Sequence, residues 1–76
     1  MRIVDVWKQE NDVLAYCIGD GIDAKFSCQE ISANGNTYHV AAFDVLRSFS
    51  GSVSAVLKLG GVEVEDVPYG TFYIVS

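Results

Sequence analysis

Three acidic side chains near the end of the chain come closest, by type and spacing, to a catalytic or metal-binding set. Glu63, Glu65 and Asp66 alternate with valines in "GGVEVEDVPYG". Two carboxylates on one strand face could divide the roles of general acid and base, or bind Ca²⁺. Acid–base pairing, however, requires environments that move the two pKa values apart, and nothing apolar shares the predicted face. We therefore expect a solvated strand face leading into a turn, with Val62 and Val64 turned to the core.

Two other parts of the sequence contain residue types that could bind a metal or take part in catalysis. The stretch "GDGID" (19–23) has Asp20 and Asp23 in the manner of a calcium loop, but the ordered ligands and closing Glu of an EF-hand are absent. A tight turn is the expected use of its two glycines. His39 has no recognisable nucleophile to activate, and the sequence contains neither a P-loop nor a GxGxxG motif. The sequence therefore predicts no catalytic residue, no cofactor, no metal ligand and no enzymatic activity.

The cysteines and the net charge indicate which cellular compartment and which classes of partner to expect. Cys17 and Cys28 form no CxxC pair, and a single His cannot complete a zinc set with them. We expect two free thiols that act as small apolar residues in the reducing cytoplasm. The charged start "MRIVDVWKQEND" is unlike a signal peptide, and no apolar run approaches the ~20 residues of a membrane span. A net charge of −5 disfavours nucleic acid and anionic lipid as partners.

The elements that must position these residues are strands. Period-two alternation runs through most of the sequence; Val53, Ala55 and Leu57, for example, share one face of a predicted strand. Asn34-Gly35 is a strong hairpin signal, and further Gly-rich or polar turns separate the other runs. The predicted strands cover residues 2–8, 13–18, 24–31, 37–47, 52–59 and 71–76, with a short extended piece at 62–67.

These strands predict an all-β fold in one domain, residues 1–76. Six or seven short strands at such spacing indicate a small barrel or sandwich. A closed antiparallel barrel is favoured, because an open sheet this apolar would present unpaired edges to other copies of itself.

Nine aromatic residues are spread over the chain, and most are expected in the core. Trp7, Tyr69 and Tyr73 are the candidates for a partner surface. Exposed aromatic rings on a sheet could stack bases, but such sites add a positively charged groove that is missing here. A barrel with this much apolar sequence could also leave a patch that a protein partner or a second copy covers, so a homodimer is a further expectation.

The order of features resembles the second domain of elongation factor Tu and related translational GTPases. That domain opens with a strand of the type of "IVDVW" (3–7), continues with apolar strands such as "VLAYCI" and "AKFSCQEI", and has a long strand like "TYHVAAFDVLRSF" (37–49). It closes with a motif to which "AVLKLGGVEVEDVPYGTFYI" (55–74) is similar. This last segment is the most specific part of the resemblance.

The resemblance implies a six- or seven-stranded β-barrel over nearly the whole chain. In that family the barrel lies beside a GTPase domain and helps to contact aminoacyl-tRNA or the ribosome. The GTPase domain is not in this sequence, so we expect a stand-alone binding module of unidentified ligand. Ribosome or tRNA binding is the alternative that the resemblance suggests, although the acidic charge opposes it.

Overall fold

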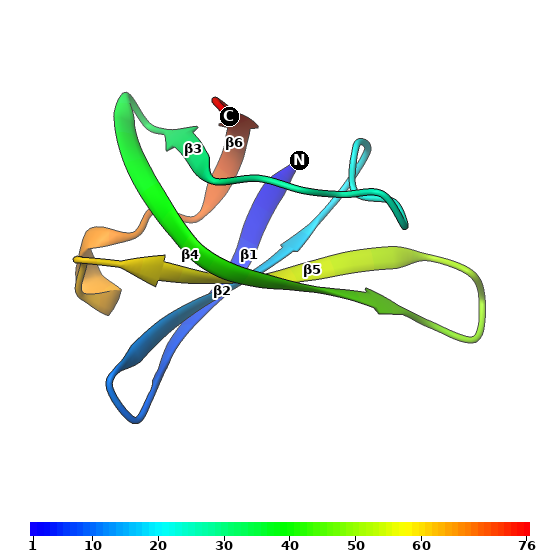
Figure 1. Cartoon of the computed structure of the whole chain (residues 1–76), viewed down its shortest axis with the longest axis horizontal. Coiled ribbons are helices and arrows are strands. Elements are labelled where there is room, and N and C mark those ends of the chain that lie inside the picture. Colours follow the sequence, from blue (N-terminus) through cyan, green and yellow to red (C-terminus); the bar gives the residue numbers. More distant parts are fainter.

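Six strands follow one another along the chain in the computed structural model, which describes residues 1–76 (Figure 1). They are β1 (Arg2–Gln9), β2 (Asp12–Ile18), β3 (Glu30–Ala33), β4 (Asn36–Arg47), β5 (Val53–Gly60) and β6 (Gly70–Ile74), with a 3₁₀ turn η1 (Val64–Asp66) before the last. They close into a barrel in the order β1-β2-β5-β4-β3-β6. Every neighbouring pair is antiparallel. The predicted closed antiparallel barrel is confirmed.

Tight turns join three of the neighbouring pairs. In the β3–β4 turn, Asn34 and Gly35 both have positive φ, 53° and 82°. Such a turn matches the right-handed twist of the flanking strands. This hairpin is the one that the Asn-Gly signal predicts.

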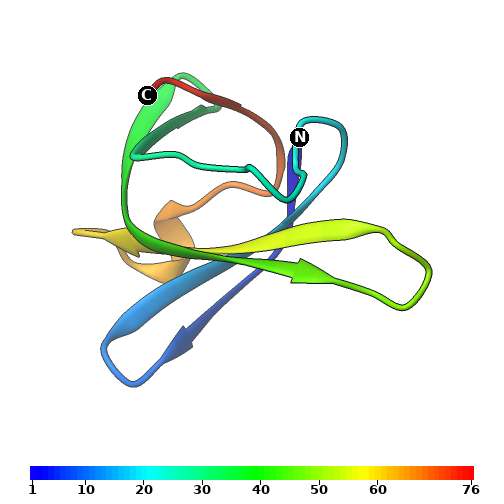
Figure 2. The ribbon, with the colours of Figure 1, turned by 45° about the vertical axis from the view of Figure 1, so that its right-hand side comes forward.

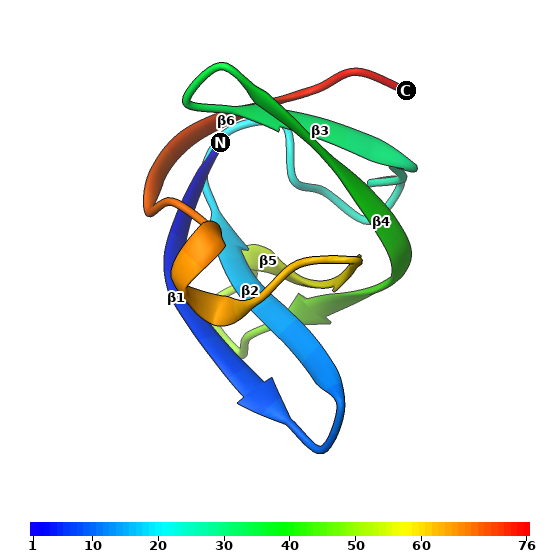
Figure 3. The same cartoon turned by 90° about the vertical axis from the view of Figure 1, so that its left-hand side faces the viewer.

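The last strand closes the barrel by bridging two sheet edges. The start of β6 pairs with β1, where Gly70 lies opposite Ile3, and its remainder pairs with β3, where Ile74 lies opposite Ile31. Figure 3 shows the strands surrounding the interior, with β6 between β1 and β3. Closure satisfies backbone groups that an open edge would expose.

The core fills the inside of this barrel. Its largest fully buried side chains come from five different strands: Phe72, Ile3, Ile31, Leu57 and Cys17. No buried polar or charged side chain is among the 17 core residues. The core is therefore held by apolar burial, worth about 25 cal/mol per Å² removed from water.

Two β-bulges adjust which residues face this core. In β4 the register shifts between Val40 and Ala42, so Ala41 is the extra residue. Tyr38 and Val40 point inward before the bulge, and Phe43 packs toward the core after it. Simple alternation from Tyr38 would place Ala42 inside and Phe43 outside, but the bulge reverses the phase. In β1 a register shift between Ile3 and Asp5 lets Ile3 and Val6, three positions apart, both lie inside.

The predicted strand at 24–31 was wrong over most of its length. Residues 23–29 form a turn and an extended segment without strand pairing, and β3 begins at Glu30. The alternation itself is real, because Phe26 and Cys28 are buried while Lys25 is exposed. The carboxylate of Asp23 accepts the N–H of Lys25 at 2.8 Å, which stabilises a turn instead of a strand. Figure 2 shows this segment crossing from the end of β2 to β3.

The short extended piece predicted at 62–67 was also wrong. Residues 64–66 form η1, in which Val67 N–H donates to Val64 O at 3.2 Å. The Asp66 carboxylate accepts the N–H of Glu63 at 3.1 Å and so closes the turn. Glu63 and Glu65 are solvent-exposed, as expected, but they do not share a strand face.

Candidate interaction site

One hairpin extends beyond the rest of the barrel. β4 pairs with β5 from His39–Gly60 to Arg47–Val53, whereas β2 pairs with β5 only as far as Ala55. The last residues of the hairpin are therefore flanked by no third strand. Figure 1 shows this arm projecting from the barrel at the side opposite to η1.

The tip of the arm, residues 48–52 ("SFSGS"), is held in one conformation by hydrogen bonds. Ser48 N–H donates to Ser52 O at 3.0 Å, and Gly51 N–H donates to Ser48 O at 3.1 Å. The Ser48 hydroxyl is also hydrogen-bonded to those of Ser50 and Ser52, at 2.8 and 2.7 Å. Gly51 has a φ of 88°, which an L-residue rarely adopts. A loop fixed in this way loses little conformational entropy when it binds.

This ordered tip presents Phe49 to solvent. The relative exposure of Phe49 is 113%, so its ring contacts essentially nothing else in the chain. Leu46, two residues before the tip, is also exposed, at 44%. Between them Arg47 is exposed and makes no salt bridge. Aromatic residues and arginine are enriched among the residues that dominate binding energy in protein interfaces.

A groove lies beside the arm. It has a volume of about 590 Å³ and runs between the β2–β3 loop and the base of the hairpin. Apolar contributions to its lining come from Tyr16, Ile18, Ile22 and Val53, and hydroxyl groups from Ser48, Ser52 and Ser54 of the arm. The carboxylate of Asp20 adds one negative charge.

The β2–β3 loop that forms one wall of the groove is fixed against the start of the chain. A Cβ on Gly19 would lie 3.2 Å from the Cα of Met1, and Gly19 has a φ of 116°. Ile22 N–H donates to Gly19 O at 3.3 Å, which closes the turn that the two glycines predict. The wall therefore rests on tight backbone packing, in which a side chain at Gly19 would be strained and Met1 would have to shift.

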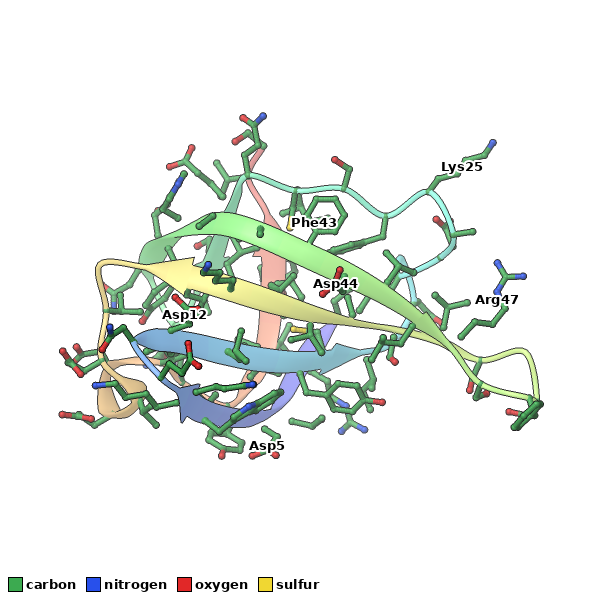
Figure 4. The ribbon with its side chains drawn as sticks, turned by 60° about the horizontal axis from the view of Figure 1, so that its bottom comes forward. Asp5, Asp12, Lys25, Phe43, Asp44 and Arg47 are labelled. Atoms are coloured by element: carbon green, nitrogen blue, oxygen red, sulfur yellow. The ribbon has the colours of Figure 1, made fainter.

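Charged side chains of both signs lie around the barrel. Figure 4 shows Lys25 and Arg47 projecting from the end that carries the arm, whereas Asp12 lies toward the other end. The only salt bridge joins Lys58 to Asp12 at 3.4 Å. In a chain of net charge −5, the arm thus offers a local positive charge next to an exposed ring.

The predicted partner residues lie elsewhere and do not form one patch. Trp7 is half-buried on β1. The hydroxyl of Tyr69, which is 61% exposed, donates to Asp5 Oδ1 at 3.4 Å and accepts the N–H of Val6 at 3.3 Å, so this side chain is tied to β1 at Asp5 and Val6. Tyr73 is 67% exposed at the far part of β6, about 13 Å along an extended chain from Tyr69.

The residues first considered for catalysis stay apart. No group of three or more His, Cys, Asp or Glu side chains is arranged to hold a metal ion. Cys17 and Cys28 are free and buried. Burial raises the pKa of the Cys17 thiol to about 12, with a further contribution from the nearby Cys28, and burial also raises the pKa of Cys28. Both therefore remain protonated at neutral pH and behave as apolar core residues.

The sequence analysis did not single out the arm, although the sequence of its tip contains one indication of it. The stretch "SFSGS" was interpreted only as a turn between strands. A Phe within a short Ser- and Gly-rich turn has little chance of burial, because a tight turn projects from the surface. The groove left no such signal, since its walls come from segments that are distant in sequence.

No family model, curated protein or solved structure matches the chain. The structure contains no helix long and apolar enough to cross a membrane.

Proposed function

We propose that the chain is a non-enzymatic binding module that contacts a partner through the arm between β4 and β5. One observation carries this proposal: Phe49 is fully exposed at a tip whose conformation four short hydrogen bonds fix. Burying such a side chain contributes about 1.5–3 kcal/mol, which the isolated chain leaves unused. A rigid, exposed aromatic ring with an adjacent arginine is the usual composition of a binding anchor.

The resemblance of the sequence to the second domain of translational GTPases supports the same function. In that family the barrel acts through contacts with other molecules. A closed barrel is what the resemblance implies for this chain, and the chain forms one. The two free, buried thiols favour a cytoplasmic setting for the module.

Affinity capture tests the proposal. Immobilised wild-type protein and the Phe49→Ser variant are incubated with cell lysate at several salt concentrations, and bound proteins are identified by mass spectrometry. Tyr73→Ser, which removes another exposed ring, is the matched control. The expected result is a protein retained by the wild type and the control but lost with Phe49→Ser. Equal recovery by all three would contradict the proposal, and so would recovery of no specific protein by a chain that also does not bind a second copy of itself.

Ribosome or RNA binding is a second candidate, favoured by one observation. Lys25 and Arg47 project from the same end of the molecule as the exposed ring of Phe49, and cationic and aromatic groups together suit single-stranded nucleic acid (Figure 4). Co-sedimentation with ribosomes at low and raised salt decides the matter. Absence from the ribosomal pellet even at low salt would exclude this candidate, because phosphate contacts are strongest there.

A further inference from the structure

The arm and the groove are complementary to each other. The arm offers an apolar ring, Phe49, and a positive charge, Arg47. The groove has a mixed lining, with an apolar part from four of its ten residues, the hydroxyl groups of three serines and the negative charge of Asp20. Both features lie at the same end of the molecule, because Ser48 and Ser52 of the tip also line the groove.

We propose that the partner of this module is a second copy of the same chain. In the dimer, Phe49 of each copy enters the groove of the other, and Arg47 of each copy faces Asp20 of the other. A two-fold axis between the two arms generates both contacts at once, as in an isologous interface. This inference rests on the proposed binding function and names its partner.

The ring of Phe49 does not fill the groove of its own copy. Hydrogen bonds between Ser48 and Ser52, through backbone and hydroxyl groups, fix the tip with the ring of Phe49 directed into solvent. The groove, about 590 Å³, is within the usual size range of ligand pockets and larger than a phenyl ring. Ring and groove therefore remain available to another molecule.

The apolar part of the groove lining suits the ring of Phe49, and the carboxylate of Asp20 suits the positive charge of Arg47. Tyr16, Ile18 and Val53 are partly exposed and provide aromatic and aliphatic contacts for a phenyl ring. Neither Arg47 nor Asp20 forms a salt bridge within its own chain, so each is free to pair across the interface. Such pairs mainly fix the orientation of the two copies.

The area of the proposed dimer interface indicates how tightly the two copies should bind. A standard stable interface buries about 800 Å² per partner, and the whole chain exposes 4798 Å². Two loops on each copy cover less than a standard interface, so a dissociation constant roughly in the micromolar range or weaker is expected. The dimer should therefore form and dissociate within an accessible concentration range.

Analytical ultracentrifugation of purified protein, from micromolar to millimolar concentration, tests the dimer. The wild type and the Tyr73→Ser control are expected to pass from monomer to dimer mass, and Phe49→Ser to dimerise at least about tenfold more weakly. A wild type that stays monomeric to millimolar concentration overturns the second copy as partner. If Phe49-dependent capture from lysate then persists, the binding module itself stands. A dimer unaffected by Phe49→Ser also overturns the inference.

Charge exchange tests the reciprocal arrangement. Arg47→Asp and Asp20→Arg each create like charges across the two-fold axis, so each variant alone is expected to dimerise more weakly than the wild type. An equimolar mixture of the two restores both opposite-charge pairs in a mixed dimer, and the double variant restores them in its own homodimer. If the mixture dimerises no more strongly than the separate variants, the proposed pairing is overturned. Both side chains are exposed, and unchanged far-UV circular dichroism checks that the variants fold.

Discussion

Replacing Phe49 with alanine is expected to change the free energy of unfolding of the monomer by no more than about 0.5 kcal/mol. The reason is that the ring makes no contacts to lose, with a relative exposure of 113%. Phe72 is the matched comparison, because its exposure is 0% and it lies on β6 inside the barrel. Phe72→Ala should cost about 3–5 kcal/mol. A chain of 76 residues has a free energy of unfolding of roughly 4–11 kcal/mol, at 0.05–0.15 kcal/mol per residue. The Phe72→Ala variant therefore loses a large share of its stability.

Urea unfolding followed by far-UV circular dichroism measures both variants. At low protein concentration, Phe49→Ala should unfold at the wild-type midpoint and Phe72→Ala at a much lower one. At high concentration the wild-type midpoint should rise, because dimerisation stabilises the folded state, and the Phe49→Ala midpoint should not. A loss above about 1 kcal/mol for Phe49→Ala in dilute solution would show that the ring packs against its own chain, and the reasoning on the arm would fail.

Three further predictions concern what holds the barrel. Tyr38→Phe removes the 2.9 Å hydrogen bond from the Tyr38 hydroxyl to Asp66 O and should lower the free energy of unfolding by about 0.5–1.5 kcal/mol in urea titrations; an unchanged value would contradict this link between β4 and η1. Gly19→Ala should cost at least about 1 kcal/mol by the same measurement, because φ is 116° and Met1 lies 3.2 Å from the new Cβ; a neutral result would mean that this contact yields. The pKa of Cys17 is about 12 in the folded chain, and its ordinary value is 9.0. As the pH rises, the thiol therefore ionises in the unfolded chain first. Wild-type stability should fall above about pH 9, by up to about 1.4 kcal/mol per pH unit. Cys17→Ala should show a shallower decline, and equal slopes would contradict the assignment.

Much of the barrel could be predicted because short-range patterns specify it. The alternation of Ala55, Leu57 and Leu59 places one face of β5 in the core, as observed. Asn34 and Gly35 adopt the positive φ angles that their hairpin turn needs. These features depend on residues within one strand or one turn, so the sequence displays them directly.

The errors arise where a distant partner or a single extra residue decides the structure. Residues 24–29 alternate as a strand does, but no neighbouring strand pairs with them before Glu30, and the turn at Asp23 prevails. At Ala41 one additional residue reverses the phase of β4, which alternation alone does not reveal.

The sequence analysis did not single out the arm, and the partner surface at Trp7, Tyr69 and Tyr73 stays a prediction. Trp7, Tyr69 and Tyr73 were chosen for their aromatic rings, and Tyr69 and Tyr73 are indeed exposed. Trp7 lies on β1 and Tyr73 on β6, and Tyr69 directly precedes β6. The projection of Phe49 on the arm follows from how far the β4–β5 pairing extends beyond the β2–β5 pairing. Relative strand lengths and register are set by long-range pairing, which one sequence does not show.

The central claim is that the barrel self-associates through the end that carries the arm. A concentration series of ¹H–¹⁵N correlation spectra of the wild-type protein tests it residue by residue. We expect amide shifts that grow with concentration and are confined to the arm, residues 46–54, and to the groove wall, residues 16–22. Shifts centred on β6 around Tyr73, or spectra that do not change with concentration, would contradict the claim of self-association through this end.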